Sequence, residues 1–304
     1  MQATDTNRDQ PLLGICLALG FCLVIPFSDA LAKILGDRFP LLQLIEARFA
    51  AQALIFLPLT WWARTRLFRS TRATGLLIAR TILQIAGLGA MFTALRFLPL
   101  ADAVAIAFVM PFLILLLGHF ALGEEVGPRR LGACLVGFAG TLMVVQPSFA
   151  TIGWPALLPL AVAVIFALFT LATRVLSAEM DPITMQSGSA LIGLTILLPL
   201  GLFELPGTPP PLGWIMPFGT DLWLLIALGV TGALGHLLFT ASLRYAPAAT
   251  IAPMQYLEIP IATLLGLVLF QQLPNGLAAA GIALTLAAGL YIVARERRLS
   301  RRAA

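Results

Sequence analysis

Long apolar stretches recur along the whole chain, separated by short segments rich in glycine, proline and charged residues. Each stretch holds about 18–25 residues, which is long enough for an α-helix to cross the hydrocarbon core of a bilayer. The short alternating segments typical of outer-membrane barrels do not occur in the sequence. The pattern therefore predicts transmembrane helices at residues 11–35, 41–61, 74–95, 99–121, 129–146, 153–175, 183–204, 222–244, 248–270 and 276–294.

The composition excludes a water-soluble protein. Of the 304 residues, 60% are hydrophobic and 11% are charged, whereas about 25% are charged in typical soluble domains. The mean hydropathy is +0.96, and folding in water would leave a large apolar surface exposed. We therefore predict an all-α membrane protein with ten transmembrane helices. Its short connections leave no room for a soluble catalytic domain.

The basic residues gather in alternate connections. Arg64 and Arg66 follow the second predicted helix, and Arg129 and Arg130 begin the fifth, whereas the connection at 205–220 has no Lys or Arg. Short loops rich in Arg and Lys stay in the cytoplasm, so both termini are expected there. The net charge of +5 then reflects orientation in a lipid bilayer, and no nucleic-acid partner is expected.

The two halves of the chain resemble each other. The segment FTALRFLPLADAVAIAFVMPF (92–112) aligns with FTASLRYAPAATIAPMQYLEIPI (239–261). Arg96 then matches Arg244, and Lys33 matches Arg174 in an earlier block. Because each copy holds five helices, an odd number, the second copy should be inserted upside down, as in many secondary transporters. The predicted repeats are residues 1–147 and 148–304.

Three segments carry a resemblance to a known family: RFLPLADAVAIAFVMPFLILLLGHFALGE (96–124), LGACLVGFAGTLMVV (131–145) and RYAPAATIAPMQYLEIPIATLLG (244–266). They resemble the drug/metabolite transporter superfamily, specifically EamA-type bacterial permeases of five plus five helices. The resemblance implies secondary active transport of a small organic metabolite across the bacterial inner membrane by alternating access. The second-half segment and the LYIVARERR ending are most similar to the branch of riboflavin and S-adenosylmethionine uptake permeases.

The chain departs from the family pattern in three features, two of which concern residues 108–111. Met110-Pro111 stands where a Glu-Pro pair is typical, and FQQ (270–272) stands where the first half has LGE. FVMP replaces the aromatic-rich stretch of the family's aromatic amino-acid exporters, which disfavours such a substrate. An amino acid, a vitamin or a nucleoside derivative otherwise remains open.

Ionisable residues inside the predicted spans are costly to insert and survive by pairing or by facing a cavity. Counting along the first helical hairpin predicts two ion pairs, Asp29 with Arg48 and Lys33 with Glu46. One interpretation is a neutral quartet that locks this hairpin. The other is a transport pathway in which Arg48 binds an anionic group of the substrate, while Asp29 or Glu46 carries a proton.

Further polar residues complete the predicted site. Glu258 lies between Pro253 and Pro260, where a broken helix either lines a site or forms a structural hydrogen bond. The histidines are either buried structural residues or proton relays, and Arg80 is expected to extend toward the membrane surface. The predicted substrate-binding residues are Arg48, Gln84, Gln186, Gln255, Tyr256 and Glu258. The proton-coupling candidates are Asp29, Glu46, His119 and His236.

No motif indicates catalysis or a cofactor. The sequence has no GxxxxGK[ST], HExxH or GxSxG motif and no paired cysteines suited to zinc. We therefore predict a transporter and not an enzyme, with neither cofactor nor bound metal and no obligate protein partner; a homodimer is left open. The alternative is a membrane-embedded enzyme acting on a lipid or isoprenoid substrate.

Overall fold

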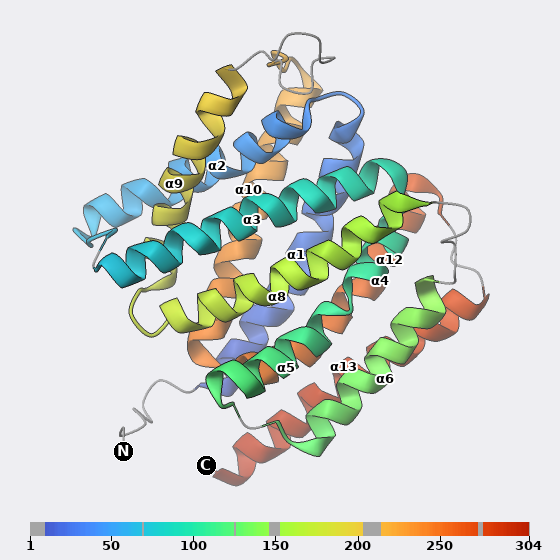
Figure 1. Ribbon diagram of the computed structural model, residues 1–304. Coiled ribbons are helices and arrows are strands. Elements are labelled where there is room, and N and C mark those ends of the chain that lie inside the picture. Colours follow the sequence, from blue (N-terminus) through green and yellow to red (C-terminus); the bar gives the residue numbers. More distant parts are fainter. Residues whose placement is uncertain are drawn as a thin grey trace.

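The computed structural model describes residues 10–68, 70–124, 126–145, 153–202, 214–272 and 276–303, and all regular elements within these ranges are helices (Figure 1). The first half contains α1 (Pro11–Gly36), α2 (Leu41–Trp62), α3 (Thr71–Phe97), α4 (Leu100–Ala107), α5 (Met110–Leu122) and α6 (Pro128–Val145). The second half contains η1 (Trp154–Leu157), α8 (Leu158–Leu176), α9 (Pro182–Leu202), α10 (Thr220–Tyr245), α11 (Ala248–Ile251), η2 (Ala252–Leu257), α12 (Glu258–Phe270) and α13 (Gly276–Ala303).

These helices match the predicted spans in order and position. In the described ranges, 8 helical segments are long and apolar enough to cross a membrane. One of them combines α4 with α5, and another combines α11, η2 and α12. The predicted spans at 129–146 and 276–294 correspond to α6 and α13, whose apolar stretches are shorter, Leu131–Gly140 and Ala279–Tyr291. The all-helical membrane fold is thus confirmed.

The spans predicted as continuous at 99–121 and 248–270 are in fact broken. Pro111 has no N–H to donate to the carbonyl of Ala107, and the first helix ends there. In the second half, Pro253 lies in the 3₁₀ helix η2, which separates α11 from α12. Pro260 falls in the first turn of α12, where its missing N–H is not needed. Two prolines therefore interrupt the backbone at related places in the two halves.

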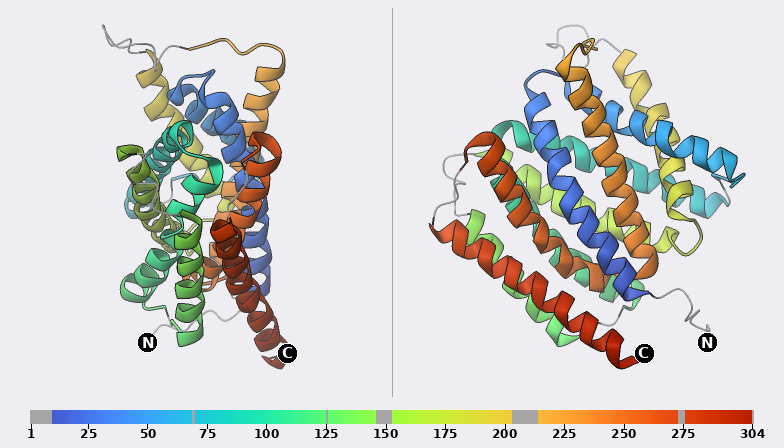
Figure 2. Two further views of the ribbon diagram at one scale, coloured as in Figure 1. Left: turned by 90° about the vertical axis from the view of Figure 1, so that its right-hand side faces the viewer. Right: turned by 180° about the vertical axis from the view of Figure 1, so that it is seen from behind.

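The helix packing follows the internal repeat. Contacts are most extensive between α1 and α10, between α3 and α8, between α2 and α9, and between α6 and α13. The repeat relates α1 to α8, α2 to α9, α3 to α10 and α6 to α13. Exchanging the two halves therefore turns the α1–α10 pair into the α8–α3 pair and leaves the α2–α9 and α6–α13 pairs unchanged. This is the pseudo-two-fold relation expected of inverted repeats. Figure 1 and the rear view in Figure 2 show α1 beside α10 and α13 beside α6 at the periphery.

Small residues allow these helices to approach closely. A Cβ added to Gly14 would lie 2.6 Å from the Cβ of Ala246, and one added to Gly140 would lie 2.8 Å from the carbonyl oxygen of Gly281. These contacts join α1 to the end of α10 and α6 to α13. Lipid gives no hydrophobic drive for helix association, so tight backbone approach of this kind holds membrane helices together.

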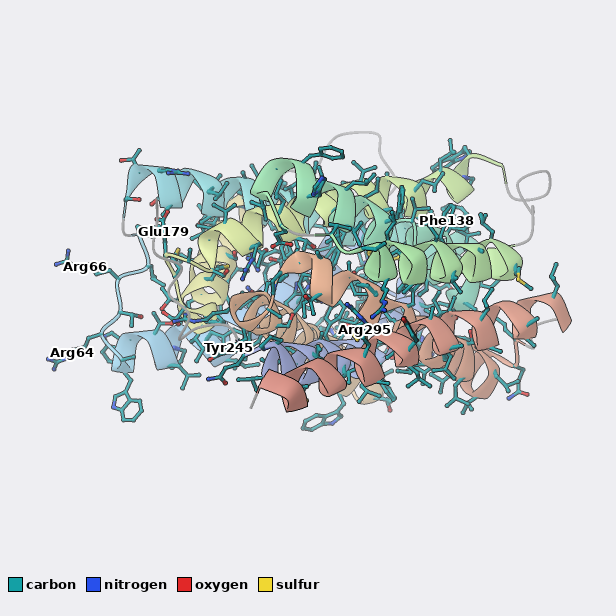
Figure 3. All side chains as sticks on the ribbon, turned by 90° about the horizontal axis from the view of Figure 1, so that it is seen from below. Arg64, Arg66, Phe138, Glu179, Tyr245 and Arg295 are labelled. Carbon is teal, nitrogen blue, oxygen red and sulfur yellow. The ribbon has the colours of Figure 1, made fainter. Side chains whose placement is uncertain are left out.

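The five tryptophans of the chain are exposed and lie at or near helix ends. Trp61 and Trp62 end α2, whereas Trp154, Trp214 and Trp223 lie before or at the start of helices that begin at the opposite end of the bundle. Tryptophan is enriched at both membrane–water interfaces. Arg64 and Arg66, which follow α2, lie at the same end of the bundle as Glu179 (Figure 3). The tryptophans therefore mark two interfacial levels on a multi-pass membrane protein.

Candidate functional site

A cavity lies among α1, α2, α3, α8, α10 and α12, next to the break between α4 and α5. Both repeats therefore contribute to its wall. Its volume is about 90 Å³, below the ~300–1,000 Å³ of typical ligand pockets. The described conformation thus has room for part of a metabolite but not for a whole one. The polar residues of its wall are Asp29, Arg48, Gln84, His236 and Glu258.

Arg48 is the central cation of this wall. Its side chain is 3% exposed. Its Nη1 donates to Ser28 Oγ at 2.8 Å, and its Cζ lies 5.7 Å from the ring centroid of Phe92. Its Nη2, in contrast, has no hydrogen-bond partner among the described residues. One nitrogen of a buried guanidinium at the cavity wall therefore keeps its donors unused in this conformation.

Three more cavity residues have an unpartnered buried polar atom. These atoms are Gln84 Oε1, His236 Nδ1 and Glu258 Oε2. Unsatisfied groups of this kind cost free energy and are rare away from functional sites. Together with Arg48 these residues line one small cavity, although the four atoms themselves are covered in the described conformation. The wall of the cavity therefore contains donors and acceptors that this conformation leaves unused.

The two buried carboxyl groups of the cavity come from opposite repeats. Asp29 lies in α1, and Glu258 is the first residue of α12, directly after the 3₁₀ segment η2. They are 6% and 4% exposed, respectively. Carboxyl groups at this depth are costly unless they face a cavity or a partner. Both line the cavity that contains Arg48.

Aromatic rings form the apolar part of the wall. Phe166 of α8 lies between Phe21 and Phe169, with ring centroids 6.3 Å and 5.6 Å away. Phe169 also contacts His236 edge-on at 5.7 Å, and Phe108 lines the cavity at the α4–α5 break. Aromatic side chains with a few placed polar groups are typical of small-molecule sites.

The predicted substrate-binding residues divide into two groups. Arg48, Gln84 and Glu258 line the cavity, and their role in substrate binding stays a prediction. Gln186 and Tyr256 do not line it. Gln186 donates to Thr240 Oγ1 at 2.9 Å and accepts from Gln52 at 2.9 Å.

Tyr256 faces a neighbouring helix. Its hydroxyl donates to the carbonyl oxygen of Cys134 in α6 at 3.1 Å, and its ring packs against Gly137. Gln255, the residue before it, is fully buried in η2 but does not line the cavity. Because Gln255 and Tyr256 are close to Glu258 in sequence, we expected all three side chains to point toward the same site. The 3₁₀ geometry of η2 directs them differently.

The proton-coupling candidates divide in the same way. Asp29 and His236 line the cavity. His119 is exposed at the end of α5, where its Nδ1 lies 3.2 Å from the carbonyl oxygen of Glu124. Glu46 accepts a hydrogen bond from Trp214 Nε1 at 2.9 Å. It therefore holds the segment before α10 and does not face the cavity.

The predicted quartet of ion pairs is wrong. Lys33 Nζ donates to the carbonyl oxygens of Leu95 and Leu98, at 2.7 Å and 2.6 Å, and not to Glu46. In the described residues Arg48 and Asp29 share the cavity without forming an ion pair, because Arg48 bonds Ser28 instead. The prediction used depth along two helices and ignored the ends of α3 and α10, which supply the actual partners.

The prediction for Arg80 is also wrong, because its side chain does not extend to the membrane surface. It is fully buried, and it donates hydrogen bonds to hydroxyl groups on three helices. Its Cζ also lies 4.5 Å from the ring centroid of Phe169. The acceptors are Thr173 at 2.9 Å, Ser189 at 2.6 Å and Thr240 at 3.1 Å. The sequence feature that pointed toward the protein interior was the spacing of Arg80 and Gln84, which lie one helical turn apart on the same face of α3.

A carboxylate at the end of α5 caps the broken helix of the second repeat. Glu124 accepts from the backbone N–H groups of Ala248 at 3.1 Å and Ala249 at 2.9 Å. It also lies 3.3 Å from Arg174 Nε. Arg174 in turn donates to the carbonyl oxygen of Leu243 at 2.6 Å, and this bond repeats the one from Lys33 to Leu95 in the first half.

A bundle of apolar helices in two related halves, enclosing between them a largely apolar cavity with a few buried polar groups, is the architecture of a multi-pass membrane transporter. The sequence matches the EamA-like transporter family over residues 12–146 and 153–294, one match for each half. The chain belongs to this family. The predicted recognition of the drug/metabolite transporter superfamily, and with it the predicted function as a small-metabolite transporter, is thereby confirmed.

Curated relatives include transporters of several named solutes. A riboflavin transporter of Rhizobium johnstonii is 32% identical over 75% of this chain and 72% of its own length. An S-adenosylmethionine uptake transporter of Rickettsia prowazekii is 23% identical over 94% of each chain. A pseudopaline exporter of Pseudomonas aeruginosa is 27% identical over 95% of this chain and 96% of the exporter.

A solved crystal structure has the same fold. It superposes with a TM-score of 0.72 at 20% sequence identity, over 92% of this chain and 97% of the other. At this identity the similarity concerns the fold alone.

Proposed function

We propose that this protein is a secondary active transporter that moves a small amphipathic metabolite across the bacterial inner membrane through the cavity at Arg48. The observation that supports it most directly is the unpartnered Nη2 of Arg48, which shares the cavity with Glu258 from the other repeat. Substrate sites of repeat-built transporters lie between the repeats near mid-membrane.

In this proposal Arg48 donates to an acceptor of the substrate, such as a carboxylate or ring carbonyl oxygen. Gln84 and Glu258 accept from its donors, and the rings of Phe108 and Phe166 contact its apolar part. A vitamin or nucleoside derivative has all three features. The printed names of the relatives, riboflavin and S-adenosylmethionine transporters, support solutes of this kind as the first to test.

Transport would proceed by alternating access. A cavity of about 90 Å³ must widen to admit a metabolite, and separation of the repeats at 1–147 and 148–304 would widen it toward one side at a time. The distribution of arginines supports an orientation with both termini in the cytoplasm. The bacterial relatives support the inner membrane as the location.

Asp29, Glu258 and His236 are the proposed proton carriers. They line the same cavity as Arg48, so a substrate bound there and a proton on a carboxyl group would interact directly. We expect Asp29→Asn and Glu258→Gln to flatten the pH dependence of uptake into proteoliposomes. Glu46→Gln, which lies outside the cavity, is the control and should retain that dependence. Unchanged pH profiles in both cavity variants would refute proton coupling.

The transport proposal is tested by counterflow. Purified protein in proteoliposomes loaded with unlabelled riboflavin or S-adenosylmethionine should accumulate the labelled solute transiently. Arg48→Ala should raise KM strongly and reduce the accumulation at low solute concentration, while the protein still inserts and folds. The labelled solute recovered from the vesicles should be chemically unchanged, whereas a modified product would favour the membrane-embedded enzyme.

A further inference from the structure

Gly232 of α10 lies directly against the guanidinium group of Arg48. A Cβ built on Gly232 would lie 2.5 Å from Arg48 Cζ and 2.7 Å from Nη2, and would also overlap Nε. Separations below 3.0 Å force a neighbouring atom to move. Any side chain at position 232 would therefore displace the group that we assign to substrate binding.

Two other contacts restrain the same guanidinium. Ser28 of α1 accepts from Nη1 at 2.8 Å, and the ring of Phe92 lies 5.7 Å from Cζ. Together with the backbone of Gly232 these contacts restrict the guanidinium from three helices. The guanidinium nitrogen without a hydrogen-bond partner in the described residues is Nη2, so these surroundings fix the group and leave that nitrogen unused.

We propose that Gly232 is a positioning residue for substrate binding: its missing side chain provides the space in which the guanidinium of Arg48 is held at the cavity wall. This inference rests on the proposed function, since it assigns a role within the same site. A planar guanidinium loses less freedom on binding when its geometry is fixed beforehand. Displacing it should weaken substrate binding more than it slows the conformational steps.

The repeat supports a role specific to this site. By the spacing that matches Arg96 with Arg244, Gly232 corresponds to Gln84, and by the spacing that matches Lys33 with Arg174, Arg48 corresponds to Ser189. In one repeat-related pair a glycine, Gly232, faces an arginine, Arg48. In the other pair, Gln84 and Ser189, both the glycine and the arginine are replaced. A glycine needed only for helix packing has no reason to accompany the arginine.

Gly229, one turn earlier in α10, provides the matched control. A Cβ there would lie 2.5 Å from the Cβ of Ala51 and 2.9 Å from the carbonyl oxygen of Ala47. This crowding is at least as severe, because the neighbours are a Cβ and a backbone oxygen that cannot rotate away, and it involves the same helix pair, α10 and α2, without the guanidinium. Gly229→Ala thus separates the effect of tighter helix packing from the effect on Arg48.

The experiment measures uptake of labelled riboflavin or S-adenosylmethionine by proteoliposomes containing the full chain. Gly232→Ala should raise KM at least tenfold, with a much smaller change in kcat, because one charge-assisted hydrogen bond is misdirected. Gly229→Ala should lower the unfolding temperature and leave KM within about twofold. In an Arg48→Ala background, Gly232→Ala should add nothing further to KM.

An unchanged KM in folded Gly232→Ala, or an additive effect in the Arg48→Ala background, would overturn the inference. If wild-type protein moves neither solute, the transport proposal loses its first two candidates, but the positioning of Arg48 is still decided by thermal unfolding. The melting shifts of Gly232→Ala and Arg48→Ala should then be strongly non-additive. Additive shifts would show that Gly232 does not position the guanidinium.

Discussion

Glu124 and Gln272 occupy matched positions in the two repeats, and only Glu124 binds the start of a helix. Glu124 caps α11 through the N–H groups of Ala248 and Ala249 and pairs with Arg174. The Oε1 of Gln272 has no hydrogen-bond partner among the residues that the structure describes. The backbone around both residues is the same, since each N–H returns to a glycine carbonyl six residues earlier. The two ends of the bundle are therefore held with unequal strength.

Glu124→Gln should lower the free energy of unfolding by about 1–3 kcal/mol, because the helix start loses a charged acceptor and Arg174 loses its partner. Thermal unfolding of purified protein in detergent measures the change. Gln272→Ala is the control, and it should cost clearly less because Gln272 Oε1 bonds nothing. Equal losses in the two variants would contradict the asymmetry.

Lys33→Ala should destabilise the protein by about 2 kcal/mol, because two buried carbonyl oxygens at the end of α3 lose a charged donor. Arg38→Ala removes a pair with Asp221 whose side chains are 52% and 31% exposed. The loss there should stay under about 1 kcal/mol, since solvent screens exposed ion pairs. Chemical denaturation of both variants tests the order, and a larger loss for Arg38→Ala would refute it.

Glu46→Ala should lower stability by about 1–2 kcal/mol without raising KM, because its carboxylate holds Trp214 and does not line the cavity. Glu46→Gln keeps an acceptor for Trp214 Nε1 and should behave almost as wild type. The measurements are the unfolding midpoint and the KM for uptake. A rise in KM in Glu46→Gln would return this residue to the substrate pathway.

Tyr256→Phe should cost about 1 kcal/mol of stability, the value of one hydrogen bond to the carbonyl oxygen of Cys134. KM should remain unchanged, since Tyr256 faces α6 and not the cavity. Gly137→Ala should cost more, because a Cβ there would lie 2.6 Å from the tyrosine ring. Substrate-specific loss in Tyr256→Phe would contradict a structural role for this residue.

The sequence predicted the fold well because its signals are local. Apolar length, loop charge and proline position determine where helices cross the bilayer, and the match between Lys33 and Arg174 reappears as equivalent contacts to Leu95 and Leu243. The breaks at Pro111 and Pro253 were harder to locate, since proline either kinks or ends a membrane helix depending on its neighbours.

The site was only half predictable because side-chain direction depends on packing between helices distant in sequence. Arg48, Gln84 and Glu258 share a cavity as predicted, but Glu46, two residues from Arg48, binds a segment more than 160 residues away. Helical spacing shows which residues of one helix face together. It does not show that the partner of Arg48 is Ser28 or that Gly232 provides its space.

Arg80 is solvated by hydroxyl groups, and in the described part of the chain no carboxylate is among its hydrogen-bond partners. Hydroxyl dipoles stabilise a cation but do not cancel its field, and a guanidinium stays protonated throughout the physiological pH range. Arg80 therefore places a permanent positive charge behind Phe169, with its Cζ 4.5 Å from the ring centroid, and Phe169 lines the cavity. This charge does not depend on the protonation of the cavity carboxyl groups, so one part of the electrostatic potential beside the cavity stays the same when the pH changes.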